Sequence, residues 1–179
     1  MARSDAVDRF DDRADALIDR LRGNPVADRV FYAASAAGDH GLVWIALAVA
    51  RYFTGVGGAE AAHYAGIRAG CAELFQSIFV NIGIKSLFRR ERPVSQAPRP
   101  YHLRIPRTSS FPSGHATASF CAAVLLSQGT PWGFVLFPLA MVVAFSRAFV
   151  RIHHASDVVG GIVVGLVIGL TIAHFFPLP

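Results

Sequence analysis

From residue 25 onward, long runs of apolar residues are separated by short polar breaks. Residues 116–146 contain no charged side chain, and residues 158–179 contain none when His174 is neutral. The turn-forming residues Gly129-Thr130-Pro131 divide the first run into two parts. The pattern predicts six helices, at residues 26–38, 41–54, 60–88, 114–128, 131–149 and 157–175.

These helices fit a lipid bilayer better than a water-soluble core. About 20 apolar residues span the hydrocarbon layer of a membrane. The chain is 53% hydrophobic and 16% charged, which is too little polar sequence to cover its apolar helices from water. We therefore expect residues 25–179 to form a multi-pass, all-α integral membrane domain of about six transmembrane helices, located in the cell membrane.

Residues 1–24 have a different character and predict an amphipathic helix over residues 5–22. Its apolar side chains recur on one stripe at 3.6-residue spacing. They are Val7, Phe10, Ala14, Leu17, Ile18 and Leu21. Six Arg and seven Asp lie within residues 1–29, so no cleavable signal peptide is expected. The helix either lies in the membrane interface or packs, solvated, on the rest of the protein.

The net charge of +5 is concentrated in one segment. Residues 85–107 carry seven Lys or Arg against the single acid Glu91, whereas the rest of the chain is nearly neutral. A nucleic-acid-binding domain would spread many more cations over its exterior. We therefore expect no nucleic-acid partner and, instead, a local anion site at one membrane face.

The basic segment leads into a proline-rich polar loop at residues 89–113. This loop joins two predicted membrane helices and is unusually long, which often indicates function. Lys85 and Arg92 are seven residues apart, so they project from one face if the helix continues to Arg92. They are either interfacial anchors or ligands of an anion.

A helix start follows the loop at Phe111-Pro112-Ser113-Gly114-His115. Ser113 is a suitable N-cap, and Gly114 lets a ligand approach the backbone closely. The free N–H groups of a first helical turn bind anions. His115 would therefore lie beside an anion bound at this helix start.

A third polar group lies between the last two predicted helices. Arg147 ends one helix and Asp157 begins the next, so both face the side of the loop at 89–113. An Asp that accepts one imidazole N–H raises the basicity of the other ring nitrogen. His153, four residues before Asp157, fits this arrangement, and adjacent His154 is the competitor. The acids of the chain are too dispersed for a carboxylate metal site, so we expect no metal ion or other cofactor.

Three motifs together carry a resemblance. Lys85-x6-Arg92-Pro93, Pro112-Ser113-Gly114-His115 and Ser146-Arg147-x5-His153-x3-Asp157 resemble the three-part signature of the type-2 phosphatidic acid phosphatase and vanadium haloperoxidase superfamily. The resemblance covers about residues 25–176 and leaves the amphipathic N-terminus outside.

The resemblance implies a role for each motif residue. His153 would attack phosphorus and form a phosphohistidine, with Asp157 holding its ring. His115 would protonate the leaving oxygen and then help to activate water. The phosphate oxygens would be held by Lys85, Arg92, Ser113, Gly114 and Arg147.

The leading hypothesis is a membrane phosphatase acting on a lipid phosphate or diphosphate. A polyprenyl diphosphate such as undecaprenyl diphosphate is favoured. The alternatives are phosphatidate, phosphatidylglycerol phosphate and a polyprenyl-phosphoryl sugar phosphate. A vanadate-dependent haloperoxidase and a non-catalytic lipid-binding or transport protein are competing readings of the same sequence.

The sequence also bears on the membrane orientation of the protein and on its assembly. Six helices would put both termini on the side opposite the site, and Lys and Arg are almost evenly divided between the two sides in that arrangement. The resemblance implies a cytoplasmic N-terminus and an extracytoplasmic site. The repeated glycines Gly161, Gly165 and Gly169 would pack within the bundle, with a homodimer seam as the alternative.

Overall fold

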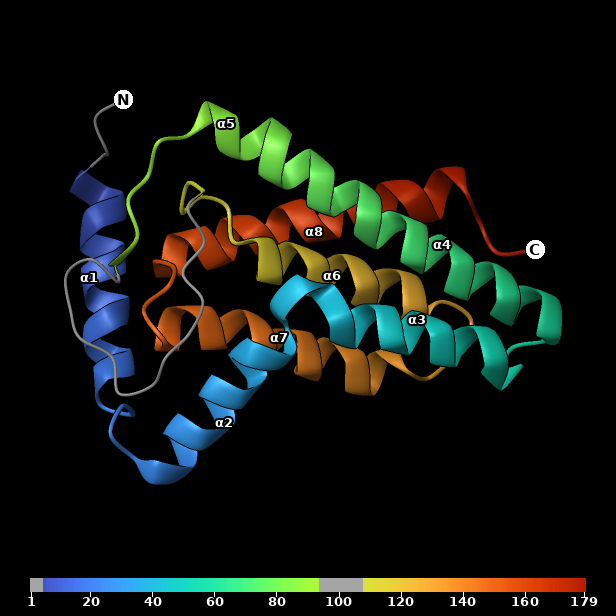
Figure 1. Ribbon diagram of the computed structural model, residues 1–179, viewed down its shortest axis with the longest axis horizontal. Coiled ribbons are helices and arrows are strands. Elements are labelled where there is room, and N and C mark those ends of the chain that lie inside the picture. The colour runs from blue at the N-terminus through green and yellow to red at the C-terminus, as the bar shows by residue number, and fades with distance from the viewer. Residues whose placement is uncertain (1–4, 94–107) are drawn as a thin grey trace.

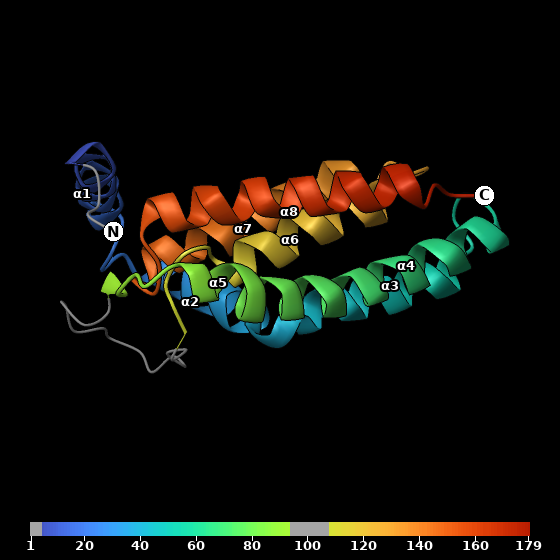
Figure 2. The same ribbon diagram turned by 90° about the horizontal axis from the view of Figure 1, so that it is seen from above.

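The helices run side by side in two layers, α3 with α4 and α6 with α7 and α8 (Figure 2). The computed structural model describes residues 5–93 and 108–179, so most of the predicted polar loop lies outside the described residues. The helices are α1 (Asp5–Asp19), α2 (Pro25–Ala37), the 3-10 turn η1 (Asp39–Gly41), α3 (Leu42–Thr54), α4 (Ala59–Ile78), the π-helical segment η2 (Phe79–Ile84), α5 (Lys85–Leu87), α6 (Gly114–Ser127), α7 (Gly133–Phe149) and α8 (Ala155–Phe175). These two ranges contain no strand, which confirms the all-α prediction.

Helix α6 forms the centre of the bundle (Figure 1). It packs against α4, α7 and α8, and 11 of its 14 residues are buried. Small side chains make this possible, because Ala, Ser and Thr let neighbouring helix backbones approach closely. The result is a helix buried on all sides, in agreement with the uninterrupted apolar run from which it was predicted.

The repeated glycines of α8 face α6 of the same chain. A Cβ on Gly161 would lie 2.5 Å from the Ser113 carbonyl oxygen, and a Cβ on Gly165 would overlap the Thr117 carbonyl. Gly169 makes the same close approach to Cys121. This face is therefore buried within the bundle, as the first of the two alternatives requires, and does not form a dimer seam.

We expect Gly165→Ala to lower stability by about 1–3 kcal/mol, because the added methyl group meets fixed backbone. Gly70→Ala in α4 is the matched control: a Cβ there has no neighbour within 4 Å, and alanine favours a helix. Thermal unfolding of both variants in detergent measures the difference. Equal unfolding temperatures for the two variants would contradict the packing described here.

Helices α2 and α3 follow one bent path and do not form the antiparallel pair that a six-span count requires. The Asn24 side chain caps α2 by accepting from Val26 N (2.9 Å) and Ala27 N (3.2 Å). The two helices meet at a bend of 68° at η1, where Gly41 has a left-handed φ of 68°. Together they run towards the end of the molecule where the C-terminus lies (Figure 1).

This bend corrects the prediction that both termini lie opposite the site. The C-terminus does, but α1 lies at the other end, across the ends of α7 and α8 (Figures 1 and 2). In the described part of the chain, α8 is the one helix that is long and apolar enough to span a membrane alone. Helices α2 and α3 satisfy the same criteria only together, and α6 and α7 are shorter apolar helices.

Helix α1 attaches through its polar side. Arg22 donates from Nε to the Phe149 carbonyl (2.8 Å) and from Nη2 to the Ala148 carbonyl (3.0 Å), and Arg151 pairs with Asp19 at 2.7 Å. Part of the apolar stripe, including Phe10 and Leu17, remains exposed. Helix α1 thus packs on the protein while leaving an apolar flank uncovered.

Candidate active site

Four helix ends meet around a cavity of about 380 Å³. They are the end of α5, the start of α6, the end of α7 and the start of α8, which all lie at the α1 end of the bundle (Figure 1). The predicted site residues that line the cavity are Lys85, Gly114, His115, Arg147 and His153. The structure therefore brings the three sequence motifs together, as their positions at helix ends predicted.

His153 lies in the turn between α7 and α8 and is almost fully buried. Arg92 Nη1 lies 3.1 Å from His153 Nε2. Because a guanidinium can only donate, Nε2 accepts this bond and the ring proton lies on Nδ1. Nδ1 is 3.7 Å from Asp157 Oδ2 and 3.3 Å from Ser110 Oγ. The nitrogen that carries the lone pair is thus on the side of the cations.

Burial lowers the pKa of His153 to about 3. We therefore expect its imidazole to stay neutral, and so nucleophilic, throughout the physiological pH range. Histidine NMR in detergent, with His153→Gln to assign the signal, should show no titration of this ring above about pH 4, because its titration is centred near the lowered pKa. A midpoint near the ordinary histidine value of about 6.5 would contradict this environment.

Asp157 begins α8 and is fully buried. Its Oδ2 accepts from Ser110 Oγ (2.5 Å) and from the backbone N–H of His154 (2.9 Å). His154 is the N-cap of α8, so this histidine has a structural position at the helix start. Two uncharged hydrogen-bond donors therefore hold the carboxylate of Asp157, the predicted partner of His153.

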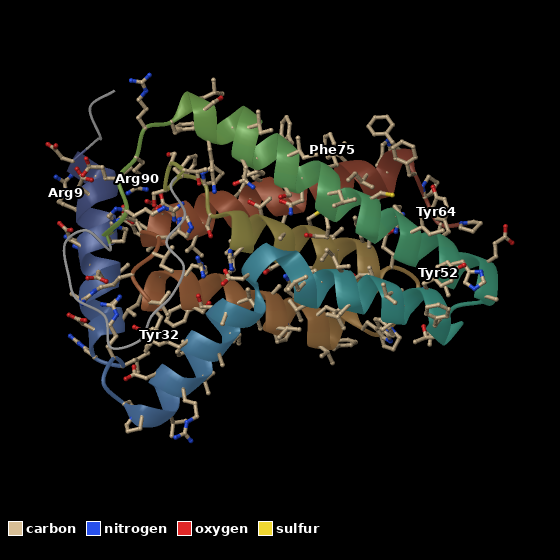
Figure 3. The ribbon with its side chains drawn as sticks, viewed as in Figure 1. Arg9, Tyr32, Tyr52, Tyr64, Phe75 and Arg90 are labelled. Carbon is tan, nitrogen blue, oxygen red and sulfur yellow. The ribbon has the colours of Figure 1, made fainter. Side chains whose placement is uncertain are left out.

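An arginine at an unspecified position of the first motif completes the Asp157 environment. Arg90 forms an ion pair with Asp157 and a second ion pair with Asp11 of α1. Asp11 also accepts from the backbone N–H and the hydroxyl of Ser156, both at 2.8 Å. Figure 3 shows Arg90 beside α1 at this end of the bundle. Helix α1 is thus connected to the buried carboxylate of the site.

The cations of the cavity are held in place by carbonyl and hydroxyl oxygens. Arg92 donates to the carbonyls of Thr108, Ser109 and Ile152, and Lys85 Nζ donates to Asn81 Oδ1 at 3.0 Å. Arg147 donates to the Ser35 hydroxyl. Because most of these partners are neutral, much of the positive charge is left for an anion.

The start of α6 is built as the sequence predicts. Ser113 is the N-cap, with its hydroxyl 3.4 Å from Ala116 N, and its own backbone N–H donates to the Asp157 carbonyl at 3.0 Å. A Cβ on Gly114 would lie 3.7 Å from Lys85 Nζ. The first turn of α6 therefore faces the lysine across a glycine, which leaves its backbone open to a ligand.

His115 lies in the first turn of α6 and lines the cavity together with His153. It has a carboxylate partner of its own. Its Nε2 lies 3.1 Å from Asp39 Oδ1 of η1. In the described ranges, no group of three or more His, Cys, Asp or Glu residues is arranged to hold a metal ion.

A family model described as the PAP2 superfamily matches residues 66–178. The chain belongs to this superfamily. The resemblance to type-2 phosphatidic acid phosphatases is thereby confirmed. The matched range includes every predicted site residue, whereas Asp11, Ser35 and Asp39 precede it.

Relatives of the PAP2 superfamily include phosphatases of lipid-linked phosphates. The chain is 36% identical over 143 residues to decaprenylphosphoryl-5-phosphoribose phosphatase of Mycolicibacterium smegmatis, covering 79% of this chain and 74% of that protein. It is 34% identical over 89 residues to the putative undecaprenyl-diphosphatase YbjG of Escherichia coli, covering 49% of this chain and 45% of that protein.

Two solved PAP2-type structures share the fold. The transmembrane PAP2 type phosphatidylglycerolphosphate phosphatase of Bacillus subtilis superposes with a TM-score of 0.69 at 22% identity, covering 96% of this chain and 87% of that chain. Aquifex aeolicus LpxE superposes with a TM-score of 0.70 at 23% identity, covering 90% and 93%. At these identities the likeness establishes the fold alone.

Several residues that contact the PAP2 motif residues, directly or, for Asp11, through Arg90, were not identified from the sequence. They are Asp11, Ser35, Asp39, Asn81, Arg90 and Ser110. The only available signals were the position of Arg90 inside the first motif and the break in the helical pattern around Asp39. The others are single polar residues whose partners lie far away in the sequence.

Proposed function

We propose that this protein is a membrane-embedded phosphatase that removes phosphate from a lipid-linked phosphate through a phosphohistidine on His153, with no metal ion in the reaction. The observation that carries the proposal is a buried histidine whose Nε2 lies 3.1 Å from Arg92 Nη1, at a cavity lined by Lys85 and Arg147.

In the first step, His153 Nε2 attacks the phosphorus atom and forms the P–N bond. The bond between phosphorus and the leaving oxygen breaks, and that oxygen takes a proton from His115. Arg92 must turn one N–H from Nε2 to a phosphate oxygen as the substrate binds. The Nδ1 proton of His153 then lies beside Asp157, which stabilises the positive charge that develops on the ring.

In the second step, a water molecule attacks the phosphohistidine. His115, now neutral, accepts a proton from this water, the P–N bond breaks, and inorganic phosphate leaves. Phosphoryl transfer depends mainly on positioning and on neutralising the equatorial oxygens. Lys85, Arg92 and Arg147 supply that neutralisation, with the first turn of α6 as a further donor.

The polar groups that line the cavity favour some of the candidate substrates over others. Glu73 and Gln76 on α4 also line it, and each is only 4% exposed. Their Oε1 atoms find no hydrogen-bond partner among the described residues. Sugar hydroxyls would satisfy these acceptors, whereas a bare polyprenyl chain would not. We therefore place a polyprenyl-phosphoryl sugar phosphate, the kind of substrate named for the Mycolicibacterium relative, ahead of the polyprenyl diphosphate predicted from the motifs.

Phosphate release from the purified protein in detergent tests the proposal. The panel contains a polyprenyl-phosphoryl sugar phosphate, a polyprenyl diphosphate, phosphatidate and phosphatidylglycerol phosphate, each with and without a chelator. Loss of activity with the chelator would overturn the metal-free mechanism. A preference for the diphosphate, unchanged in Glu73→Gln, would overturn the order of substrates. Vanadate-dependent halide oxidation without phosphate release would support the haloperoxidase alternative.

The position of α1 also bears on which side of the membrane the site faces. In the described ranges, eleven Lys or Arg residues lie in α1, its junction with α2, the first half of α2, residues 85–93, the end of α7 and the α7–α8 turn, all at the site end. Arg51 and Arg68 lie towards the other end, where Arg68 donates to the Phe176 carbonyl. Cytoplasmic faces carry the excess of Lys and Arg, and acids count little.

We therefore propose that the site faces the cytoplasm, contrary to the expectation from the resemblance. With α1 at the site end, a cytoplasmic N-terminus and an extracytoplasmic site cannot both hold. A membrane-impermeant maleimide applied to intact cells tests this in a Cys71→Ser background. Glu60→Cys, at the start of α4, should be labelled, and Asp8→Cys on α1 should be protected. The opposite labelling pattern would restore the extracytoplasmic site.

A further inference from the structure

The second histidine of the site is paired with a carboxylate that lies outside all three motifs and outside the matched family range. His115 Nε2 is 3.1 Å from Asp39 Oδ1, and both side chains line the cavity. The Asp39 side chain is 32% exposed and that of His115 is 15% exposed. The pair therefore lies where a ligand in the cavity can reach it.

The local sequence explains how Asp39 comes to this position. A Cβ on Gly38 would lie 2.7 Å from His115 Cδ2, so only glycine lets the chain pass this close to the ring. Helix α2 ends here, η1 turns the chain, and Gly41 adopts the left-handed conformation before α3 begins. The break between α2 and α3 thus lies at the level of His115 and turns Asp39 towards it.

The charges around His115 explain what a carboxylate does there. Arg147 of α7 faces the ring, and Lys85 lies across Gly114, the residue before His115. Two cations disfavour a third positive charge on the imidazole. Asp39 opposes them, and the Ser35 carbonyl also accepts a hydrogen bond from the ring. Burial of the ring and the charge of Arg147 outweigh these two acceptors and lower the pKa of His115, so the resting ring is neutral. Asp39 and the Ser35 carbonyl make its protonation easier, and the protonated ring is the form that can protonate a leaving oxygen.

We propose that Asp39 is a positioning residue that orients His115 and favours its protonation when a phosphate anion occupies the cavity, so that the ring can protonate the departing alcohol, an inference that rests on the proposed phosphatase function. As the bond between phosphorus and the leaving oxygen breaks, the proton shared by His115 and Asp39 moves to that oxygen. In the second step His115 takes a proton from water, and the pair returns to its starting state. Each catalytic histidine thus has its own carboxylate, Asp157 for the nucleophile and Asp39 for the acid.

The test compares two substrates that differ in their need for an acid. An alkyl phosphate such as butyl phosphate must have its leaving oxygen protonated, whereas p-nitrophenyl phosphate releases a stable anion. The measured quantity is kcat/KM, because it reports only the steps through release of the alcohol. Asp39→Asn should lower kcat/KM for the alkyl ester by about 10–100-fold, and for the nitrophenyl ester by less than about 3-fold.

Two further variants separate positioning from a general structural effect. Glu60→Gln makes the same change of carboxylate to amide at an exposed position on α4 and should leave both substrates unaffected. Adding Asp39→Asn to His115→Ala should cause no further loss on the alkyl ester, because Asp39 acts through His115. Thermal unfolding of each variant in detergent shows that the bundle remains intact.

Defined outcomes would overturn the inference. An equal loss on both esters, no loss on the alkyl ester, or an additive loss in the double variant would each remove Asp39 from this role while leaving the phosphatase function standing. If the wild-type protein hydrolyses neither ester nor any lipid phosphate, the proposed function fails and this inference fails with it.

Discussion

His153→Ala should lower phosphate release by at least about 10⁴-fold, since loss of a nucleophile removes the whole covalent route. The variant should still fold, because the alanine removes a neutral ring whose only described polar contacts are Arg92, Ser110 and Asp157. Phosphate release and thermal unfolding are measured on the same preparation.

The adjacent histidine provides the matched control. His154→Ala removes the N-cap of α8, so it should cost about 0.5–2 kcal/mol of stability while keeping most of the activity. Brief reaction of the wild-type protein with a radiolabelled substrate should trap an acid-labile, base-stable phosphoprotein, and His153→Ala should not form it. Phosphate release near the wild-type rate in His153→Ala would refute the nucleophile assignment.

Asp157→Asn should lower kcat on the order of 10⁴-fold, with a smaller change in KM. The carboxylate accepts from Ser110 and from the His154 backbone, and it pairs with Arg90. An amide places an N–H₂ group against at least one of these donors. It also removes the charge that stabilises a positive His153 ring during the attack, so the nucleophile loses both its orientation and its counter-charge.

Asp11→Asn is the control for this prediction, because it weakens the Arg90 pair from the other side. This variant keeps Asp157 intact, so kcat should fall by less than about 10-fold. Its stability should fall by about 1–3 kcal/mol, the cost of impairing a buried hydrogen-bonded group. If Asp157→Asn retains a near-wild-type kcat, His153 does not depend on this carboxylate and the mechanism proposed above is wrong.

Much of the fold could be predicted from the sequence because helices in an apolar chain are specified locally. The predicted 114–128 and the observed α6 (Gly114–Ser127) differ by one residue, and α8 begins two residues before the predicted 157. The motifs lie at helix ends, and successive helices that alternate in direction bring those ends to the same face of the bundle. This is why Lys85, His115 and His153 could be expected to meet before their positions were known.

The bent α2–α3 path could not be predicted in the same way. Gly38 and Gly41 indicate a break, but a break is compatible with either a reversal or a bend. Packing decides between a reversal and a bend. Gly38 lies against His115 of α6 and Val143 of α7, and both helices are distant from Gly38 in the sequence. The side on which α1 lies, and with it the proposed membrane orientation, follows from that packing.

The sequence by itself determined the helical class, the PAP2 motifs and the residues that meet at the cavity, because periodicity and helix ends are local properties. Tertiary structure alone decided which polar residues assist them. Asp11 is one of seven Asp in residues 1–29, and nothing near it in the sequence marks it as the one that pairs with Arg90. Asp39 lies at a visible break between two predicted helices, but nothing near it in the sequence marks it as the partner of His115. A carboxylate acquires such a role only from the cation or imidazole that folding places against it, and those partners are chosen by three-dimensional packing.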